Sequence, residues 1–267
     1  MNFYTTVMGS GAAVPTLMRH CSGQVVNVNG YRLLLDCGEG TQQQMRACRQ
    51  KLQSLQLVCI SHLHGDHFFG LPGLLATLHL CGRTQPLTVI APQGVRLALD
   101  TMMALSSTQL DYELCVIELS HSDKRQVFTS PRCTVSAFPL WHSVPAYGYL
   151  IEEQPRGRSR PRCMAYCCDT GHHEALAGYV QGVDLLCIES TFADDMQTVA
   201  EEKRHLTASQ AASVARQAGV GALLLTHFSA RYRDTEVFER QASAIFPNTM
   251  LAADGLVCPV NYSEPCL

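Results

Sequence analysis

The stretch SHLHGDH, residues 61–67, places three imidazoles and one carboxylate within six consecutive positions. It follows the apolar segment 57–60, which is typical of a short buried strand, and it precedes a helical pattern that begins at Phe68. Imidazole and carboxylate are ligands that suit zinc and similar divalent ions. The stretch therefore predicts a metal-binding loop between a strand and a helix.

The spacing within this loop indicates two metal ions. Side chains two positions apart on a helix point in different directions, so His62 and His64 can reach one ion only from an extended or turn conformation. Gly65 provides a turn at this point. Asp66 and His67, beyond the glycine, are then expected to point to a second ion.

The remaining ligands are expected at the ends of other apolar strands. His142 follows the segment AFPLW, Asp169 follows AYCC, and His227 follows LLLT. A carboxylate such as Asp169 can bridge two cations, which leaves His142 to complete one site and His227 the other. The predicted ligands are therefore His62, His64, Asp66, His67, His142, Asp169 and His227.

The composition predicts a soluble globular protein. Of the 267 residues, 46% are hydrophobic and 16% are charged, which is too apolar for a disordered chain, and no apolar run is long enough for a membrane span. The 13 cysteines include no CxxC pair and no secretory start is present, which favours the reducing cytoplasm. Because the net charge is −3, a nucleic acid would need a local positive patch.

Strand patterns alternate with helical patterns along the whole chain, which predicts one α/β domain with helices covering layers of sheet. We expect strands at 3–8, 24–28, 31–36, 57–60, 87–90, 114–119, 126–128, 133–139, 147–151, 163–168, 184–188, 222–226 and 249–252. We expect helices at 42–52, 68–80, 93–103, 208–217 and 235–244.

Residues 154–162, QPRGRSRPR, form the segment with linker composition. Its prolines and glycine exclude regular structure, so we expect a protruding loop and not a domain boundary. Arginine is suited to bidentate phosphate binding, and solvated arginines here would supply a local positive patch. An ordinary solvated hairpin tip is the alternative. The candidate phosphate-binding residues are Arg156, Arg158, Arg160 and Arg162.

Taken together, the motifs resemble those of the metallo-β-lactamase superfamily and, within it, the ribonuclease Z family of endonucleases that mature tRNA 3′ ends. The similar segments are SHLHGDHFFGLPGLL (61–75), GSGAAVPTLMRHCS (9–22), LDCGEGTQ (35–42), CDT (168–170) and THFSARY (226–232). The resemblance covers nearly the whole chain. It implies a metallo-β-lactamase fold, a four-layer αββα sandwich formed by residues 1–267, with the metal cleft along one edge.

The resemblance also implies a proton relay that joins a glutamate, a histidine and the aspartate of the metal loop. Here these residues are Glu189, in IESTF, His205, in RHLTA, and Asp66. A carboxylate can orient an imidazole that protonates a leaving alkoxide. Taken alone, Glu189 and His205 would be interpreted as a helix cap or surface residues. The chain departs from the family pattern at Ile188, where His is usual, and at Cys168, where Gly or Ser is usual.

The implied function is metal-dependent cleavage of the 3′ trailer of tRNA precursors, which leaves a 3′-hydroxyl. Two Zn²⁺ ions per chain are expected, and Mn²⁺ or Fe²⁺ also accept these ligands. The family usually works as a homodimer and carries a long exosite arm between the positions of His142 and Asp169. Here 26 residues intervene, so segment 154–162 would be a shortened basic arm. Arg231 and Arg233 are further candidates for RNA binding.

Two other functions remain open. A phosphodiesterase of the same superfamily that acts on cyclic nucleotides or small diesters would need no arm. A non-catalytic protein that binds metal and RNA is the third, and the presence of both Glu189 and His205 argues against it.

Overall fold

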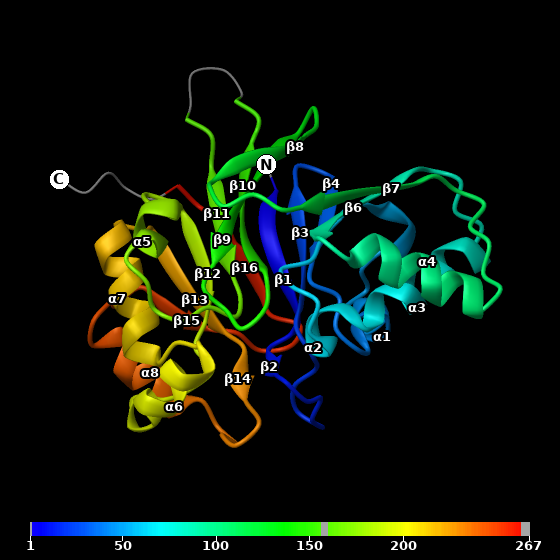
Figure 1. The fold of residues 1–267 in the computed structure, drawn as a ribbon. Helices are drawn as coiled ribbons and strands as arrows, with labels where there is room; N and C mark the ends of the chain where they lie inside the picture. Colours follow the sequence, from blue (N-terminus) through cyan, green and yellow to red (C-terminus); the bar gives the residue numbers. More distant parts are fainter. Residues whose placement is uncertain (1, 156–159, 263–267) are drawn as a thin grey trace.

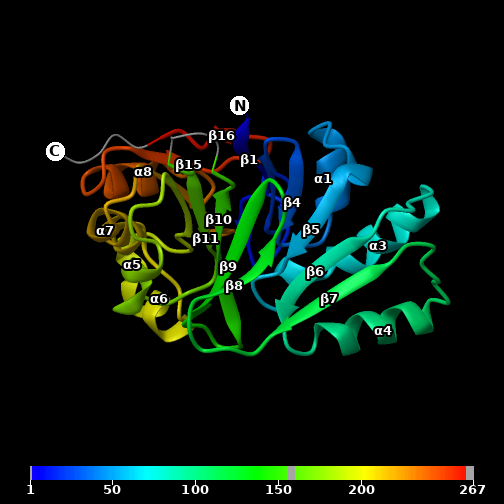
Figure 2. The ribbon, with the colours of Figure 1, turned by 90° about the horizontal axis from the view of Figure 1, so that it is seen from above.

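Two seven-stranded sheets lie face to face in the computed structural model, which describes residues 2–155 and 160–262 (Figures 1 and 2). The first sheet has the order β16 (Val257–Pro259), β1 (Phe3–Gly9), β3 (Gly23–Val28), β4 (Tyr31–Leu35), β5 (Leu55–Cys59), β6 (Leu87–Pro92) and β7 (Leu114–Leu119). The second has the order β15 (Thr249–Leu251), β13 (Ala222–Thr226), β12 (Leu185–Glu189), β11 (Cys163–Cys167), β10 (Ala146–Glu153), β9 (Cys133–Leu140) and β8 (Arg125–Thr129). A small parallel pair joins β2 (Gly11–Ala12) to β14 (Phe228–Ser229).

Helices cover the outer faces of both sheets, so the molecule has four layers (Figure 2). The helices beside the first sheet are α1 (Thr41–Ala47), α2 (Gly65–Phe68), α3 (Gly70–Leu80) and α4 (Val95–Leu105). Those beside the second are α5 (Ala175–Tyr179), α6 (Gln197–Lys203), α7 (Ala208–Ala218) and α8 (Glu236–Ser243). Short 3₁₀ turns occur at Leu52–Ser54 and Asp194–Met196. The predicted αββα sandwich is confirmed, and no helix of the described residues is both long and apolar enough to cross a membrane.

Successive side chains of the central strands enter two different cores. In β4, Leu33 and Leu35 lie in the core between the sheets, whereas Leu34 lies in the core beneath the helices. In β5, Leu57 and Val58 divide in the same way. Because neighbouring residues of a strand point to opposite faces and both faces are covered here, these strands are continuous apolar runs.

The predicted strands are all present, with bounds that differ by at most two residues. The predicted helices needed two corrections. The helix expected at 42–52 ends at Ala47, because the chain turns through Arg49, whose φ is 55°. The helix expected from Phe68 is two helices, because Gly70 packs against the carbonyl of Gly38 too closely for a side chain, and α3 begins there. The sequence did not indicate β2, β14, β16, α5 or α6.

The strand directions bring several C-terminal ends to one edge. β9 and β11 are both antiparallel to β10 and therefore run the same way, and β11, β12 and β13 are mutually parallel. In the first sheet β4 and β5 are parallel. Residues that directly follow these strands are therefore collected at a single edge of the sandwich.

Candidate metal centre and active site

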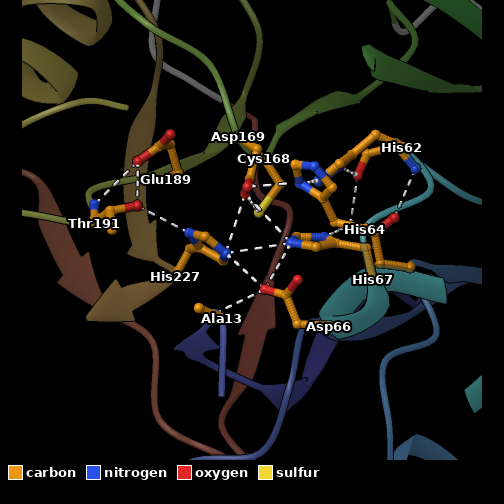
Figure 3. A network of polar contacts seen from close by, with 12 residues as sticks. Ala13, His62, His64, Asp66, His67, Cys168, Asp169, Glu189, Thr191 and His227 are labelled. Atoms are coloured by element: carbon orange, nitrogen blue, oxygen red, sulfur yellow. Dashed lines mark hydrogen bonds and ion pairs between the residues drawn. The ribbon is translucent and has the colours of Figure 1, made fainter. Parts of the chain in front are cut away.

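The seven predicted ligands meet at this edge. Figure 3 shows six of them with their side chains directed toward a common centre. His64 has extended backbone (φ −67°, ψ 149°) and precedes α2, as expected for a ligand at the turn. Asp66 and His67 lie within α2, which begins at Gly65, three residues earlier than the helical pattern predicted.

The first cluster contains His62, His64, His142 and Asp169. His64 Nδ1 lies 2.9 Å from His62 Nε2 and 3.4 Å from His142 Nε2. The Oδ2 atom of Asp169 lies 3.5 Å from His62 Nε2 and 3.6 Å from His142 Nε2. Three imidazoles from two strand ends thus surround one carboxylate oxygen.

The second cluster contains His67, His227, Asp66 and the other oxygen of Asp169. The Nε2 atoms of His67 and His227 lie 3.2 Å apart. Asp169 Oδ1 is 3.4 Å from His67 Nε2 and 3.1 Å from His227 Nε2. Asp66 Oδ2 is 3.2 Å and 3.5 Å from the same two nitrogens. Asp169 therefore stands between the clusters with one oxygen toward each, the bridging position expected from the sequence.

Hydrogen bonds at the outer nitrogens fix the tautomers of the second cluster. His67 Nδ1 donates to Asp36 Oδ2 at 2.8 Å. Thr191 donates its hydroxyl to Glu189 Oε2 at 2.6 Å and therefore accepts from His227 Nδ1 at 2.9 Å. In the neutral imidazoles both Nε2 atoms then carry lone pairs that point at each other and at carboxylate oxygens.

His62 and His142 of the first cluster are fixed in the same way. Ser61 donates its hydroxyl to Asp36 Oδ2 at 2.9 Å and accepts from His62 Nδ1 at 3.0 Å. His142 Nδ1 donates to the carbonyl of Arg204 at 3.3 Å. The Nε2 lone pairs of His62 and His142 are thereby turned toward Asp169. Both clusters are convergent sets of lone pairs, which is the donor chemistry that a divalent cation requires.

The pKa shifts agree with this fit. Burial lowers the pKa of His62 and of His142, so both imidazoles are neutral and available as ligands. Burial also acts against protonation of His67, but Asp169 and Asp36 outweigh it and raise the pKa of His67 well above its usual value. The two carboxylates therefore favour a positive charge beside His67 Nε2, which a divalent cation would supply. The residues present fit two such cations.

Glu189, the last residue of β12, is fully buried beside the second cluster. Its Oε1 accepts from His205 Nδ1 at 2.7 Å and from Thr170 N at 2.9 Å. Its Oε2 accepts from Thr191 N at 3.0 Å and from Leu206 N at 3.2 Å, in addition to the Thr191 hydroxyl. Burial raises the pKa of Glu189, but the charge and hydrogen bond of His205 outweigh burial and hold the pKa below its usual value, so the carboxylate stays ionised.

His205 is held by Glu189 and lines the cleft. Burial lowers the pKa of His205, but the charge and hydrogen bond of Glu189 outweigh burial and raise it to about 9. His205 is therefore protonated at neutral pH. Because its Nδ1–H is hydrogen-bonded to Glu189, its Nε2 proton is the one that can be donated to a substrate.

Asp66 does not contact this pair directly. A chain of contacts through His227 and Thr191 connects Asp66 to Glu189. Asp66 Oδ2 also accepts from the backbone N–H of Ala13 at 2.8 Å. The structure thus joins Glu189 and His205 as the expected relay requires, and it places Asp66 on the far side of His227.

The backbone is strained at three of these positions. Asp36, Asp169 and His227 have φ of 56°, 58° and 62°, a left-handed conformation that non-glycine residues rarely adopt. Such strain is common at functional sites, where surrounding contacts hold it in place. Here it turns each side chain sharply off the end of its strand and into the centre.

Both clusters and His205 open into one cleft of about 590 Å³. The charged or imidazole side chains that line it are His64, Asp66, His142, Asp169, Glu202, Lys203, Arg204, His205, His227 and Arg231. Cationic side chains and a donatable proton beside a dinuclear ligand set suit the hydrolysis of a phosphate ester.

Comparison with known proteins agrees with this chemistry. Residues 31–228 match the profile of the beta-lactamase superfamily domain. Ribonuclease Z of Bacteroides fragilis is 35% identical over 95% of this chain and 98% of its own length, and that of Bacteroides thetaiotaomicron is 34% identical over 97% and 96%. The chain belongs to the ribonuclease Z family. The crystal structure of the short form of human tRNase Z superposes with a TM-score of 0.85 at 31% identity, covering 97% of this chain and 99% of that one. The resemblance inferred from the sequence motifs is confirmed.

The described residues of segment 154–162, the candidate exosite arm of this ribonuclease Z family member, lie away from its cleft. The segment joins the end of β10 to the start of β11, whereas Asp169 follows the end of β11. Arg160 and Arg162 therefore lie at the opposite end of the sheet from the metal centre. Arg156 and Arg158 fall outside the described residues.

The expectation that all four arginines are solvated and available to phosphates is wrong for Arg162. Its side chain is buried and donates to both oxygens of Glu153, at 2.8 Å and 2.9 Å, and to the carbonyl of Val260 at 3.0 Å. Arg160 is exposed and paired with Asp184. Arg162 thus holds the hairpin to the C-terminal segment.

Three residues that serve the site were missed in the sequence. Asp36 is buried and accepts from Ser61, His67 and Tyr166, although it follows an apolar strand just as Asp169 does. That signal was present. The sequence contains no such signal for Thr191, which links Glu189 to His227, or for Arg204, whose carbonyl accepts from His142. Their roles depend on contacts between distant segments.

Proposed function

We propose that this member of the ribonuclease Z family is a metal-dependent endoribonuclease that removes the 3′ trailer from tRNA precursors and leaves a 3′-hydroxyl on the tRNA. The observation that carries the proposal is the buried Glu189–His205 pair, which faces the same cleft as the two ligand clusters. The relatives named ribonuclease Z and the human tRNase Z structure support it over nearly the full length of the chain.

Two divalent cations fit the clusters, with Asp169 as the shared ligand. We infer that the ions are zinc, because imidazoles outnumber carboxylates among the ligands. When bound, the ions polarise the phosphoryl group and lower the pKa of the attacking water. Asp36 and Thr191 hold His67 and His227 in the tautomers that keep their Nε2 lone pairs directed inward.

The leaving group is the next requirement. When the bond between phosphorus and the 3′ oxygen breaks, that oxygen must take up a proton. His205 carries one at Nε2 and is kept protonated by Glu189, so it acts as the general acid. The ionised Glu189 is itself held by backbone and hydroxyl donors, so it keeps its charge while His205 transfers the proton.

Positively charged side chains in the cleft bind the RNA backbone. Lys203, Arg204 and Arg231 line it and are placed to contact phosphates. The guanidinium of Arg231 lies 5.0 Å from the centroid of the Phe192 ring, which fixes its position beside the centre.

We further propose a single domain, a cytoplasmic location and a homodimer. One core joins the two sheets, which supports a single domain. The cysteines that the structure describes are free, which supports the cytoplasm. The described ends of segment 154–162 lie far from the cleft of the same chain, which supports a homodimer in which this segment of one subunit contacts RNA held by the other.

A small-diester phosphodiesterase is the second candidate, because Arg162 is unavailable to RNA. The test is incubation of the metal-loaded protein with a tRNA precursor and, separately, with bis(4-nitrophenyl) phosphate. We expect a cut at the 3′ end of the tRNA, with a 3′-hydroxyl that poly(A) polymerase can extend. Hydrolysis of the small diester without cleavage of the precursor would favour the second candidate.

A further inference from the structure

Trp141 lies in the loop between β9 and β10, directly before His142 of the first cluster. It is the single tryptophan of the sequence, and it remains 46% exposed. Its backbone N–H donates to Thr170 Oγ1 at 3.2 Å, and its carbonyl accepts from Gly171 N at 2.8 Å. The loop is thereby tied to the segment that follows Asp169, so the ring has a defined place beside the metal centre.

The ring itself is supported from two residues. A Cβ atom on Gly171 would lie 2.6 Å and 2.8 Å from the Cε3 and Cζ3 atoms of Trp141, so the glycine allows the ring to lie against the backbone. The guanidinium carbon of Arg204 is 5.5 Å from the ring centroid. Arg204 also donates to the carbonyl of His142 at 2.6 Å and has left-handed backbone (φ 57°, ψ 53°).

The charged side chains near the exposed ring of Trp141 favour a nucleic acid as its binding partner. Lys203 and Arg204 line the cleft directly beside His205. A positive groove that binds phosphates, combined with an aromatic ring that stacks on a base, is how proteins bind single-stranded RNA. Phe192 lines the cleft, but it is only 3% exposed and lies under Arg231, so it offers no surface for stacking.

We propose that Trp141, supported by Arg204 and Gly171, forms a stacking subsite for one unpaired nucleobase next to the scissile phosphate. The inference rests on the proposed function, because it concerns how the RNA substrate is held at the cleft. It adds a requirement that the metal centre does not impose, namely an unstacked base at the position that reaches Trp141.

The first test uses the intrinsic emission of Trp141, which is unambiguous because the chain has one tryptophan. Zinc-loaded His205→Ala protein is titrated with a tRNA precursor, so that little cleavage occurs during the measurement. We expect the emission to change in proportion to RNA bound, as measured separately by filter retention. A precursor with an abasic nucleotide on one side of the cleavage site should bind without that change.

The second test compares variants in otherwise native protein. Trp141→Leu should lower kcat/KM for the precursor by about 5- to 150-fold, mainly through KM, which is the range for removal of one stacking interaction. Trp141→Phe keeps an aromatic face and should recover most of this decrease. Gly171→Ala should reproduce part of it, because the added Cβ displaces the ring. Equal zinc content and thermal unfolding of the variants show that the fold is intact.

The outcomes separate the two proposals. If the precursor is neither bound nor cleaved, the proposed function is wrong and the subsite is wrong with it. If the precursor is cleaved while Trp141 emission stays unchanged at saturation, the subsite is wrong and the function stands. An unaltered kcat/KM for Trp141→Leu would overturn the subsite in the same way.

Discussion

Replacing Glu189 by glutamine tests whether this carboxylate sets the protonation of His205. Glu189 raises the pKa of His205 from 6.5 to about 9 against the effect of burial. The difference corresponds to roughly 3 kcal/mol of preference for the protonated form. Without this charge, Asp169 offsets part of the effect of burial, so the pKa of His205 should return to about its ordinary value of 6.5.

The expected change in rate depends on pH in a defined way. With a pKa of about 9, roughly 90% of His205 is protonated at pH 8, whereas a pKa of 6.5 leaves roughly 3%. The smaller protonated fraction of His205 in Glu189→Gln should therefore slow precursor cleavage about 30-fold at pH 8 but less than about twofold at pH 6. Any decrease in the amount of folded protein would lower the rate by the same factor at both pH values. The alkaline limb of the rate profile moves from about 9 to below 7.

The assay is single-turnover cleavage of a tRNA precursor between pH 5.5 and 9.5. The ratio of rates at two pH values cancels any decrease in folded protein, which is expected because a glutamine side chain cannot accept from all the donors around Glu189. Glu239→Gln, an exposed glutamate on α8, is the matched control and should keep the wild-type profile. The diester bis(4-nitrophenyl) phosphate is a second control, because its leaving group departs without a proton.

One result would refute the reasoning. If Glu189→Gln lowers the rate equally at every pH and leaves the alkaline limb near 9, then Glu189 has a structural role and His205 is not the acid that it sustains.

Five further substitutions test the site. His205→Ala should slow precursor cleavage by about 10²- to 10⁴-fold, slow the 4-nitrophenyl diester much less, and leave about two metal ions per chain by elemental analysis. His64→Ala should lose at least one ion together with activity, and retention of two ions with full activity would contradict the ligand assignment. Asp36→Asn should cost about 3–5 kcal/mol of unfolding free energy in urea and weaken metal affinity about 10- to 100-fold. Arg162→Met should lower stability without changing the salt dependence of RNA binding. Arg231→Ala should reduce the slope of log affinity against log salt by up to about 0.9 for each phosphate that the guanidinium neutralises. The reverse pattern would show that Arg162 binds RNA.

Much of the fold and of the ligand set could be predicted because both depend on local patterns. Apolar runs marked the strands, and polar residues at their ends marked His142, Asp169 and His227, since parallel strands deliver their ends to one edge. The same rule applies to Asp36, which was included in the strand before it and so was missed. α5 and α6 contain five and seven residues, too few for a helical period to show.

Other features depend on contacts that no local pattern contains. The composition of segment 154–162 indicated solvated arginines, but the register of β10 and β11 places Glu153 opposite Arg162 and buries the pair. Thr191 became part of the site because β12 and β13 lie side by side and bring Glu189 close to His227. Pairing across strands decides these roles, and composition does not.

The position of Asp36 connects the two ligand clusters. A single oxygen, Oδ2, accepts from His67 of the second cluster and, through the Ser61 hydroxyl, orients His62 of the first. Loss of this one carboxylate is therefore expected to disturb both metal positions at once, although Asp36 belongs to neither cluster. Loss of a single ligand such as His64 should act first on its own cluster.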